Sequence, residues 1–195
     1  MLNLTKGSTL DLSKGASLNL SKTETGEKGP NSWIFGLGWD PKKSNWLQSD
    51  YDLDASCVLI DTTGKKPNAV VYYGDKRGPG VTHTGDNLTG VGQGDDEQIL
   101  VDLASVLTAG YDKIVFVVNI YDAQQRRQEF KSVKNAFIRL EANGETFARY
   151  NLSDTSKDGV YGMVFAQIVY QSGDWIAQAV GNPLNFIIRD LSRLK

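Results

Sequence analysis

Cysteine and histidine are nearly absent from this sequence of 195 residues, which contains only Cys57 and His83. A single cysteine excludes an intramolecular disulfide and favours a reducing compartment, so we expect a cytoplasmic protein. The two residues together cannot supply the nitrogen and sulfur ligands of a zinc centre. They also offer little for nucleophilic catalysis, because no G-x-S-x-G motif is present and Cys57 opens an apolar run where a buried thiol is the ordinary occupant. The sequence therefore predicts a protein that is not an enzyme.

Long apolar runs and strong basic clusters are also lacking. The longest purely apolar stretches, such as IVFVV at 114–118, are far shorter than the ~20 residues that cross a bilayer. The first residues contain no continuous apolar segment of the secretory type. Basic residues gather only thinly, in AQQRRQEFKSVKN at 123–135 and near the C-terminus. We therefore expect neither a membrane-spanning protein nor direct binding of nucleic acid.

Short β-rich runs separated by turn residues fill most of the chain. Val, Ile, Phe and Tyr dominate the runs, and the gaps carry Gly, Asn, Asp and Pro. The runs are CVLID at 57–61, AVVYY at 69–73, KIVFVVNIY at 113–121, AFIRLE at 136–141, ETFARYNL at 145–152, VYGMVFAQIVYQ at 160–171 and DWIAQAV at 174–180. Because no long helices intervene, these runs predict an all-β fold, a β-sandwich of two mostly antiparallel sheets.

Both ends of the chain differ from this central part. A threefold octad, LNLTKGST, LDLSKGAS and LNLSKTET, begins at Leu2 and alternates Leu with polar residues, which predicts short strands joined by turns. We expect residues 1–31 to be an arm and linker laid on a main domain of residues 32–181, with a dedicated partner-binding element as the alternative. At the other end, an Asn-Pro pair followed by a helical apolar stripe predicts a short amphipathic helix over 182–195.

The densest polar motif is HTGDNLTGVGQGDDEQ, at 83–98. Its side-chain oxygen donors are Asp86, Asn87, Thr89, Asp95, Asp96 and Glu97, and Gly85, Gly90, Gly92 and Gly94 let backbone carbonyls turn inward. Calcium takes about six to eight oxygen ligands of mixed type at flexible distances, and this loop offers that mixture. It is not an EF-hand, because Leu88 and Gly90 occupy positions where that loop needs oxygen ligands. The alternative is a solvated, acidic, glycine-rich loop that binds nothing tightly.

A second acidic motif is SDYDLDASC, in which Asp52, Asp54 and a third aspartate alternate immediately before an apolar run. Alternate side chains of an extended segment share one face, so these carboxylates repel one another unless a cation compensates them. Lys and Arg are missing from the sequence around both motifs, over 44–64 and over 78–112. This segregation of charge favours a bound hard cation.

Six segments of the sequence resemble the successive signature blocks of the TerD family, the tellurium-resistance and stress proteins of bacteria. They are GLGWD at 36–40, DLDASCVLID at 52–61, HTGDNLTGVGQGDDE at 83–97, KIVFVV at 113–118, NAFIRL at 135–140 and ARYNLS at 148–153. The blocks also occur in the family's order. FGLGWDP followed by DLDASCVLID is most similar to the TerZ branch of that family.

The resemblance implies a β-sandwich that holds about two neighbouring calcium ions in acidic loops, in a family without an established enzymatic activity. The family's acidic positions fall on Asp40, Asp52, Asp54, Asp86, Asn87, Asp95, Asp96 and Glu97. We therefore expect a calcium-binding stress-response module that acts with other tellurium-resistance or stress proteins in a membrane-associated complex. A calcium-supported enzyme or a carbohydrate-binding sandwich is the alternative, and either would need a polar pocket beside the metal.

Overall fold

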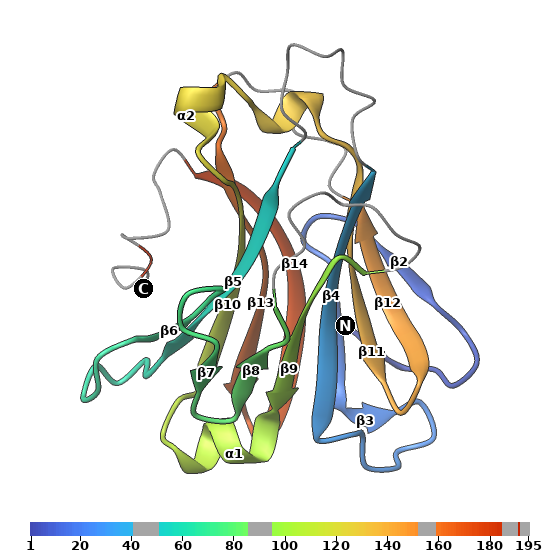
Figure 1. Cartoon of the computed structure of the whole chain (residues 1–195). Helices are drawn as coiled ribbons and strands as arrows, with labels where there is room; N and C mark the ends of the chain where they lie inside the picture. Colours follow the sequence, from blue (N-terminus) through green and yellow to red (C-terminus); the bar gives the residue numbers. More distant parts are fainter. Residues whose placement is uncertain (41–50, 86–94, 152–158, 185–190, 192–195) are drawn as a thin grey trace.

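The computed structural model describes residues 1–40, 51–85, 95–151, 159–184 and 191 of the chain. They form two seven-stranded sheets that face one another, here named sheet A and sheet B (Figure 1). In spatial order, sheet A contains β1 (Leu2–Leu4), β3 (Ser17–Thr23), β14 (Asp174–Leu184), β13 (Gly162–Gln171), β10 (Lys113–Ile120), β5 (Leu53–Ile60) and β6 (Ala69–Val71). Sheet B contains β2 (Leu10–Leu12), β12 (Glu145–Asn151), β11 (Lys134–Ala142), β4 (Ser32–Asp40), β9 (Glu97–Asp102), β8 (Val81–His83) and β7 (Arg77–Gly78). The predicted all-β sandwich is confirmed.

The helices are short and lie at opposite ends of the sandwich (Figure 1). Helix α1 (Leu103–Thr108) follows β9 directly, and it begins where the Asp102 carboxylate accepts a hydrogen bond from the Ser105 N–H at 2.7 Å. Helix α2 (Ala123–Arg126) and the 3₁₀ turn η1 (Phe130–Ser132) connect β10 to β11. Within the described ranges, no helix is long and apolar enough to cross a membrane.

Alternation along the strands builds the core between the two sheets. The rings of Phe35 on β4 and Phe116 on β10 stack across the interface, with their centroids 3.9 Å apart. Trp33 and Trp39 of β4 are also buried, and their indole N–H groups donate to backbone carbonyls at 2.9 Å and 3.2 Å. Trp175 is buried as well. These three tryptophans therefore belong to the core and do not form an exposed platform for a sugar ring.

The N-terminal octads form one coil that alternates between the sheets. The first and third octads supply β1 and β3, which pair in parallel with Leu2 opposite Leu18, whereas the second supplies β2 on sheet B. Gly7 and Gly15 lie in the turns that follow the first two strands, with φ of 74° and 87°, a conformation that glycine adopts without strain. The third octad carries Thr23 in place of this glycine, and its strand, β3, is seven residues long and includes Thr23.

This coil is part of the sandwich itself. Leu4, Leu18 and Leu20 are at most 1% exposed and belong to the same apolar cluster as the central strands. The first three strands are also hydrogen-bonded into the two sheets, β1 and β3 into sheet A and β2 into sheet B. The predicted strands are present, and the division of the chain at residue 31 stays a prediction.

The outer face of sheet A carries a second, smaller apolar cluster. It contains Val58 and Ile60 of β5, Val115 and Val117 of β10, and Leu191 from the C-terminal segment. Strand β14 continues through Leu184, so Asn182 and Pro183 are strand residues and do not start a helix. The remainder of the predicted helix, apart from Leu191, lies outside the described residues.

Candidate metal centre

The two acidic motifs meet where the edge of β5 faces β9. Among the described strands, β6 pairs only with the part of β5 from Cys57 to Leu59. The first residues of β5 therefore present backbone groups to sheet B. The Ala55 N–H donates a hydrogen bond of 2.6 Å to Oε2 of Glu97, although the two residues are 42 positions apart. Glu97 is 1% exposed. This bond joins the D-x-D motif to the start of β9, which is how the fold gathers carboxylates at one place.

His83 completes the same junction from β8. Its Nδ1 accepts a hydrogen bond of 3.1 Å from the Gly85 N–H, so this nitrogen carries no proton. Its Nε2–H then donates to the Ala55 carbonyl at 3.2 Å, with Oε2 of Glu97 at 3.5 Å. The imidazole therefore joins β8 to the edge of β5 and fixes the point where the acidic loop begins. This is a structural role, and it explains why the single histidine of the chain is buried.

Asp95 is paired with a cation that the neighbouring sequence does not contain. Its carboxylate lies 2.6 Å from Nε of Arg139 on β11 and accepts a second hydrogen bond from Gln98 at 3.0 Å. The hydrogen bond between Arg139 and Asp95 is the largest of the interactions that raise the pKa of Arg139. Glycine at position 36 makes the arrangement possible, because a Cβ there would lie 1.9 Å from the carboxylate. Although no Lys or Arg occurs in the sequence around Asp95, an arginine from a distant strand compensates its charge.

Asp96 and Asp40 lie beside the end of β4. The Asp96 carboxylate accepts a hydrogen bond of 3.0 Å from the Trp39 N–H, and the Asp96 N–H donates to the Leu37 carbonyl at 2.7 Å. Asp40 is the last residue of β4, so its backbone follows directly on this anchor. The acidic segment that opens β9 is thus held against β4 by its own backbone and by one carboxylate.

Asp54 lies on β5 and Asp52 lies immediately before this strand, and the two residues are 3% and 4% exposed. Arg126, in the last turn of α2, places its guanidinium 3.7 Å from the Asp52 carboxylate. Alternation along β5 puts both aspartates on the outer face of sheet A, in line with Val58 and Ile60. This face therefore changes from apolar to acidic along a single strand.

Two polar side chains on this face, those of Ser56 and Asn119, were not predicted as site residues from the sequence. They are 0% and 6% exposed, and within the described part of the chain neither the Ser56 hydroxyl nor either amide atom of Asn119 has a hydrogen-bond partner. An unpaired buried polar group costs about 1–3 kcal/mol. The signal that marks Asn119 in the sequence is its place as the single amide in the apolar run KIVFVVNIY.

The described residues supply part of a metal centre but no complete one. They contain no group of three or more His, Cys, Asp or Glu side chains arranged to hold a metal ion. Asp86, Asn87 and Gly90 lie outside the described residues, and the side chain of Asp40 is not described. The bond between the Ala55 N–H and Glu97 joins the segment that contains Asp52 and Asp54 to the segment that contains Asp95, Asp96 and Glu97. Their assignment to a metal stays a prediction.

Cys57 is not available for chemistry in the folded protein. It is 0% exposed, and burial raises the pKa of its thiol to about 12. The neutral thiol therefore dominates at physiological pH.

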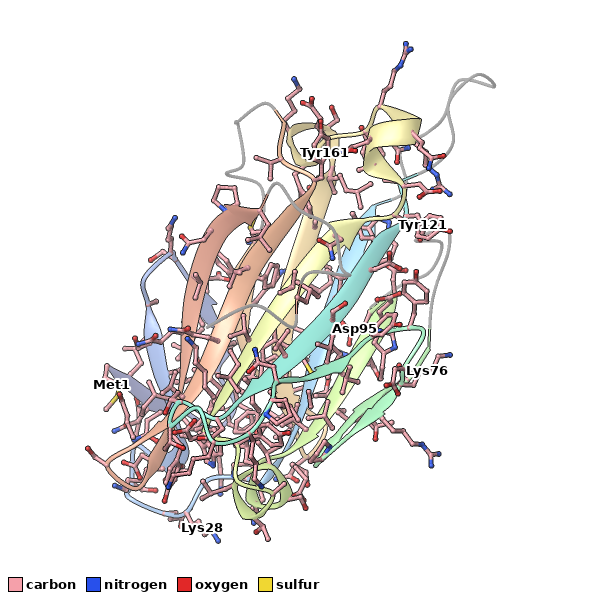
Figure 2. The ribbon with its side chains drawn as sticks, turned by 90° about the vertical axis from the view of Figure 1, so that its left-hand side faces the viewer. Met1, Lys28, Lys76, Asp95, Tyr121 and Tyr161 are labelled. Carbon is pink, nitrogen blue, oxygen red and sulfur yellow. The ribbon has the colours of Figure 1, made fainter. Side chains whose placement is uncertain are left out.

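Figure 2 shows Asp95 between the end of the molecule that carries Tyr121 and Tyr161 and the end that carries Lys28.

The fold and the site together define a β-sandwich protein in which a buried carboxylate, that of Glu97, joins the two sheets. A family model, the TerD domain, matches residues 8–193. The chain is 40% identical to stress response protein SCP2 of Bacillus subtilis, with 82% of this chain and 86% of the relative covered. It is 42% identical to the tellurium resistance protein TerD of an Alcaligenes species, with 76% and 78% covered. The chain belongs to the TerD family.

Two further comparisons refine this result. The tellurium resistance protein TerZ of Serratia marcescens is 40% identical over 76% of this chain and 78% of its own length. Identity to TerD and TerZ relatives is thus nearly equal, so the family prediction is confirmed but the TerZ branch is not distinguished. A crystal structure of a homologue of the telluride resistance protein TerD from Streptomyces coelicolor superposes with a TM-score of 0.69 at 18% identity, covering 84% of this chain and 96% of that one. It supports the fold.

Proposed function

We propose that the acidic end of the sandwich binds about two calcium ions and that the protein acts as a binding module, without catalysis. The observation that carries this proposal is the bond from the Ala55 N–H to Glu97, which brings buried carboxylates from two distant segments together. Buried carboxylates are costly unless cations compensate them. A hard cation with flexible coordination suits oxygen donors that come from strand ends and from a glycine-rich loop.

The donors fall into different roles. Glu97 and Asp96 open β9, and the segment that contains Asp86, Asn87 and Gly90 directly precedes them in the chain. Asp54 contributes from β5, Asp52 from the position just before β5, and Asp40 from the last position of β4. Asp95 is committed to Arg139, and we assign it to positioning the loop and not to direct coordination.

The names of the relatives support a role in tellurium resistance and general stress. In this role the protein would act as a scaffold for other tellurium-resistance or stress proteins in a complex at the cytoplasmic side of the membrane. The buried thiol of Cys57 suits a reducing cytoplasm. Calcium binding would stiffen the acidic end of the sandwich and so present a defined surface to such partners.

Calorimetry and thermal unfolding test the proposal on metal-free protein titrated with calcium and with magnesium. Saturation at about one hundred times Kd adds about 2.7 kcal/mol of stability, which raises the Tm of a chain of this size by roughly 5–10 °C. Magnesium should do less, because its strict octahedral shell suits a flexible mixed-ligand site poorly.

A double variant, Asp54→Asn with Asp96→Asn, should lose most of the calcium heat. Asp174→Asn is the matched control, because this aspartate pairs with Lys22 at 2.8 Å on the far side of sheet A. If the unchanged protein shows neither calcium heat nor a shift of Tm at millimolar calcium, the acidic end is only a charged surface and the proposal fails.

A further inference from the structure

We infer that residues 185–195 pack as an amphipathic segment on the outer face of sheet A, and that this segment prevents the face from pairing with a second copy of the chain. The inference concerns the apolar part of this face, around Val58 and Ile60, and it does not depend on calcium. It goes beyond the proposed function, because it assigns a docking surface and names its occupant.

Sheet A is covered on both faces at its centre. All eight residues of β5 are buried, and so are the seven residues of β10 from Ile114 to Ile120. Alternate residues of these strands point away from sheet B, so burial of both sets requires a further layer outside sheet A. Strand β9 of sheet B differs, because its buried residues alternate with less buried ones and Leu100 on its outer side is 37% exposed.

Leu191 identifies the segment that supplies this layer. It is 0% exposed and packs in the outer-face cluster with Val58, Ile60, Val115 and Val117. Among the described members of this cluster, Leu191 is the one that does not come from a strand of sheet A, since the partly buried residues around it come from β6, β13 and β14. The part of the chain that carries Leu191 therefore lies on the outer face.

One leucine is too small to cover this surface alone. The cluster extends over five neighbouring strands, from β6 to β14, and strands about 4.8 Å apart make this width about 19 Å. An eleven-residue helix is about 16 Å long, so residues 185–195 in the predicted helical form match the width of the cluster. Strand β14 leads directly into this segment, because it ends at Leu184, which also packs on the cluster.

The sequence of the segment has the pattern that such a layer needs. In a helix, its apolar residues share one side with the end of β14, and they are Leu184, Ile187, Ile188, Leu191 and Leu194. Arg189 and Arg193 fall on the opposite side, where their charges favour contact with water. Without this cover, the valines and isoleucine of the cluster would form an exposed apolar sheet face, and two such faces can pack on one another.

The first test uses single substitutions in the full chain, Leu191→Cys and Arg193→Cys, and measures the rate at which a thiol reagent modifies each protein. The native Cys57 is 0% exposed, so it should not react in the folded protein. We expect Leu191→Cys to react at least about tenfold more slowly than its matched control Arg193→Cys, because a thiol packed on the sheet reacts only after local opening. Equal rates in the folded protein would overturn the inference.

A chain that ends at Leu184 tests whether the segment prevents association. Removal of residues 185–195 should lower the Tm by about 5 °C or more, and it should raise the molar mass measured by light scattering above that of the full chain. A synthetic peptide of residues 185–195 should reverse this association, whereas the same peptide with Leu191→Ser should not. An unchanged mass of the folded, shortened chain would overturn the inference, as would an association that the peptide does not reverse. If the shortened chain does not fold, the two cysteine variants decide alone.

Discussion

Removing Arg139 should destabilise the protein more than removing the charge of its partner Asp95. The Asp95 side chain is 0% exposed, and Arg139 is 27% exposed and has a second carboxylate, Glu141, at 2.6 Å. Arg139→Met therefore leaves a fully buried carboxylate with only neutral donors such as Gln98. Asp95→Asn leaves a guanidinium that keeps Glu141 and partial access to water. The asymmetry follows from the unequal burial of the two partners.

The expected magnitudes differ enough to be measured. Breaking a buried pair so that one charge remains uncompensated costs about 3–5 kcal/mol, whereas losing one charge-assisted hydrogen bond costs about 1.5–3 kcal/mol. With a urea m-value of about 2 kcal/mol/M, Arg139→Met should lower the unfolding midpoint by about 2 M and Asp95→Asn by about 1 M. Both measurements are made in the presence of a chelator, so that the metal makes no contribution.

Arg149→Met provides the control, because Arg149 is the cross-strand partner of Arg139 on β12 but stacks on Phe137 and, among the described residues, pairs with no buried carboxylate. Its loss should cost about 1 kcal/mol or less. If Asp95→Asn proves as costly as Arg139→Met, the charge of Asp95 is compensated mainly by some other group. The positioning role assigned to this pair would then be wrong.

Two further predictions concern titratable groups away from the site. Hydrogen bonds from Thr63, then from backbone N–H groups, lower the pKa of Asp61 below 3.8, so its contribution to stability is complete above that pH and is lost as the pH falls through the lowered value. The difference in urea midpoint between the unchanged protein and Asp61→Asn should therefore shrink between about pH 5 and about pH 2, and a constant difference would contradict it. Cys57, with its pKa of about 12, should resist a thiol reagent until guanidinium unfolds the protein, and fast modification of the folded chain would show that it is exposed.

Much of the sandwich could be predicted from local pattern, because strand formation by Val, Ile, Phe and Tyr depends mainly on neighbouring residues. All seven predicted β-rich runs contain strands, from β5 to β14. Strand β4 was not among them, since glycines in GLGWD normally weaken a strand. The structure shows why Gly36 is there: the buried carboxylate of Asp95 occupies the space that a side chain would need. A glycine that serves a distant residue cannot be recognised from its own neighbourhood.

The sequence identified the acidic residues of the candidate site but not the cations that pair with them. Acidic residues identify the two motifs, yet the cations that lie beside Asp52 and Asp95 come from α2 and β11, more than 40 positions away. A count of charged residues within a short stretch of sequence cannot reveal partners that are so distant along the chain. Asn119 was missed for a related reason, because one amide in an apolar strand becomes informative only when its cross-strand partner, Asp54, is known.

The coil at the N-terminus carries a consequence for how this end of the chain can vary in length. Leu2 pairs with Leu18 and Asn3 with Asn19, so equivalent positions of the first and third octads recur after sixteen residues. Insertion of two octads would place one new strand beside β1 and another beside β2, with every later residue undisturbed. A single inserted octad would instead send each preceding Leu-x-Leu segment to the opposite sheet. Growth at this edge should therefore proceed in pairs of octads, as layers are added to a helical stack.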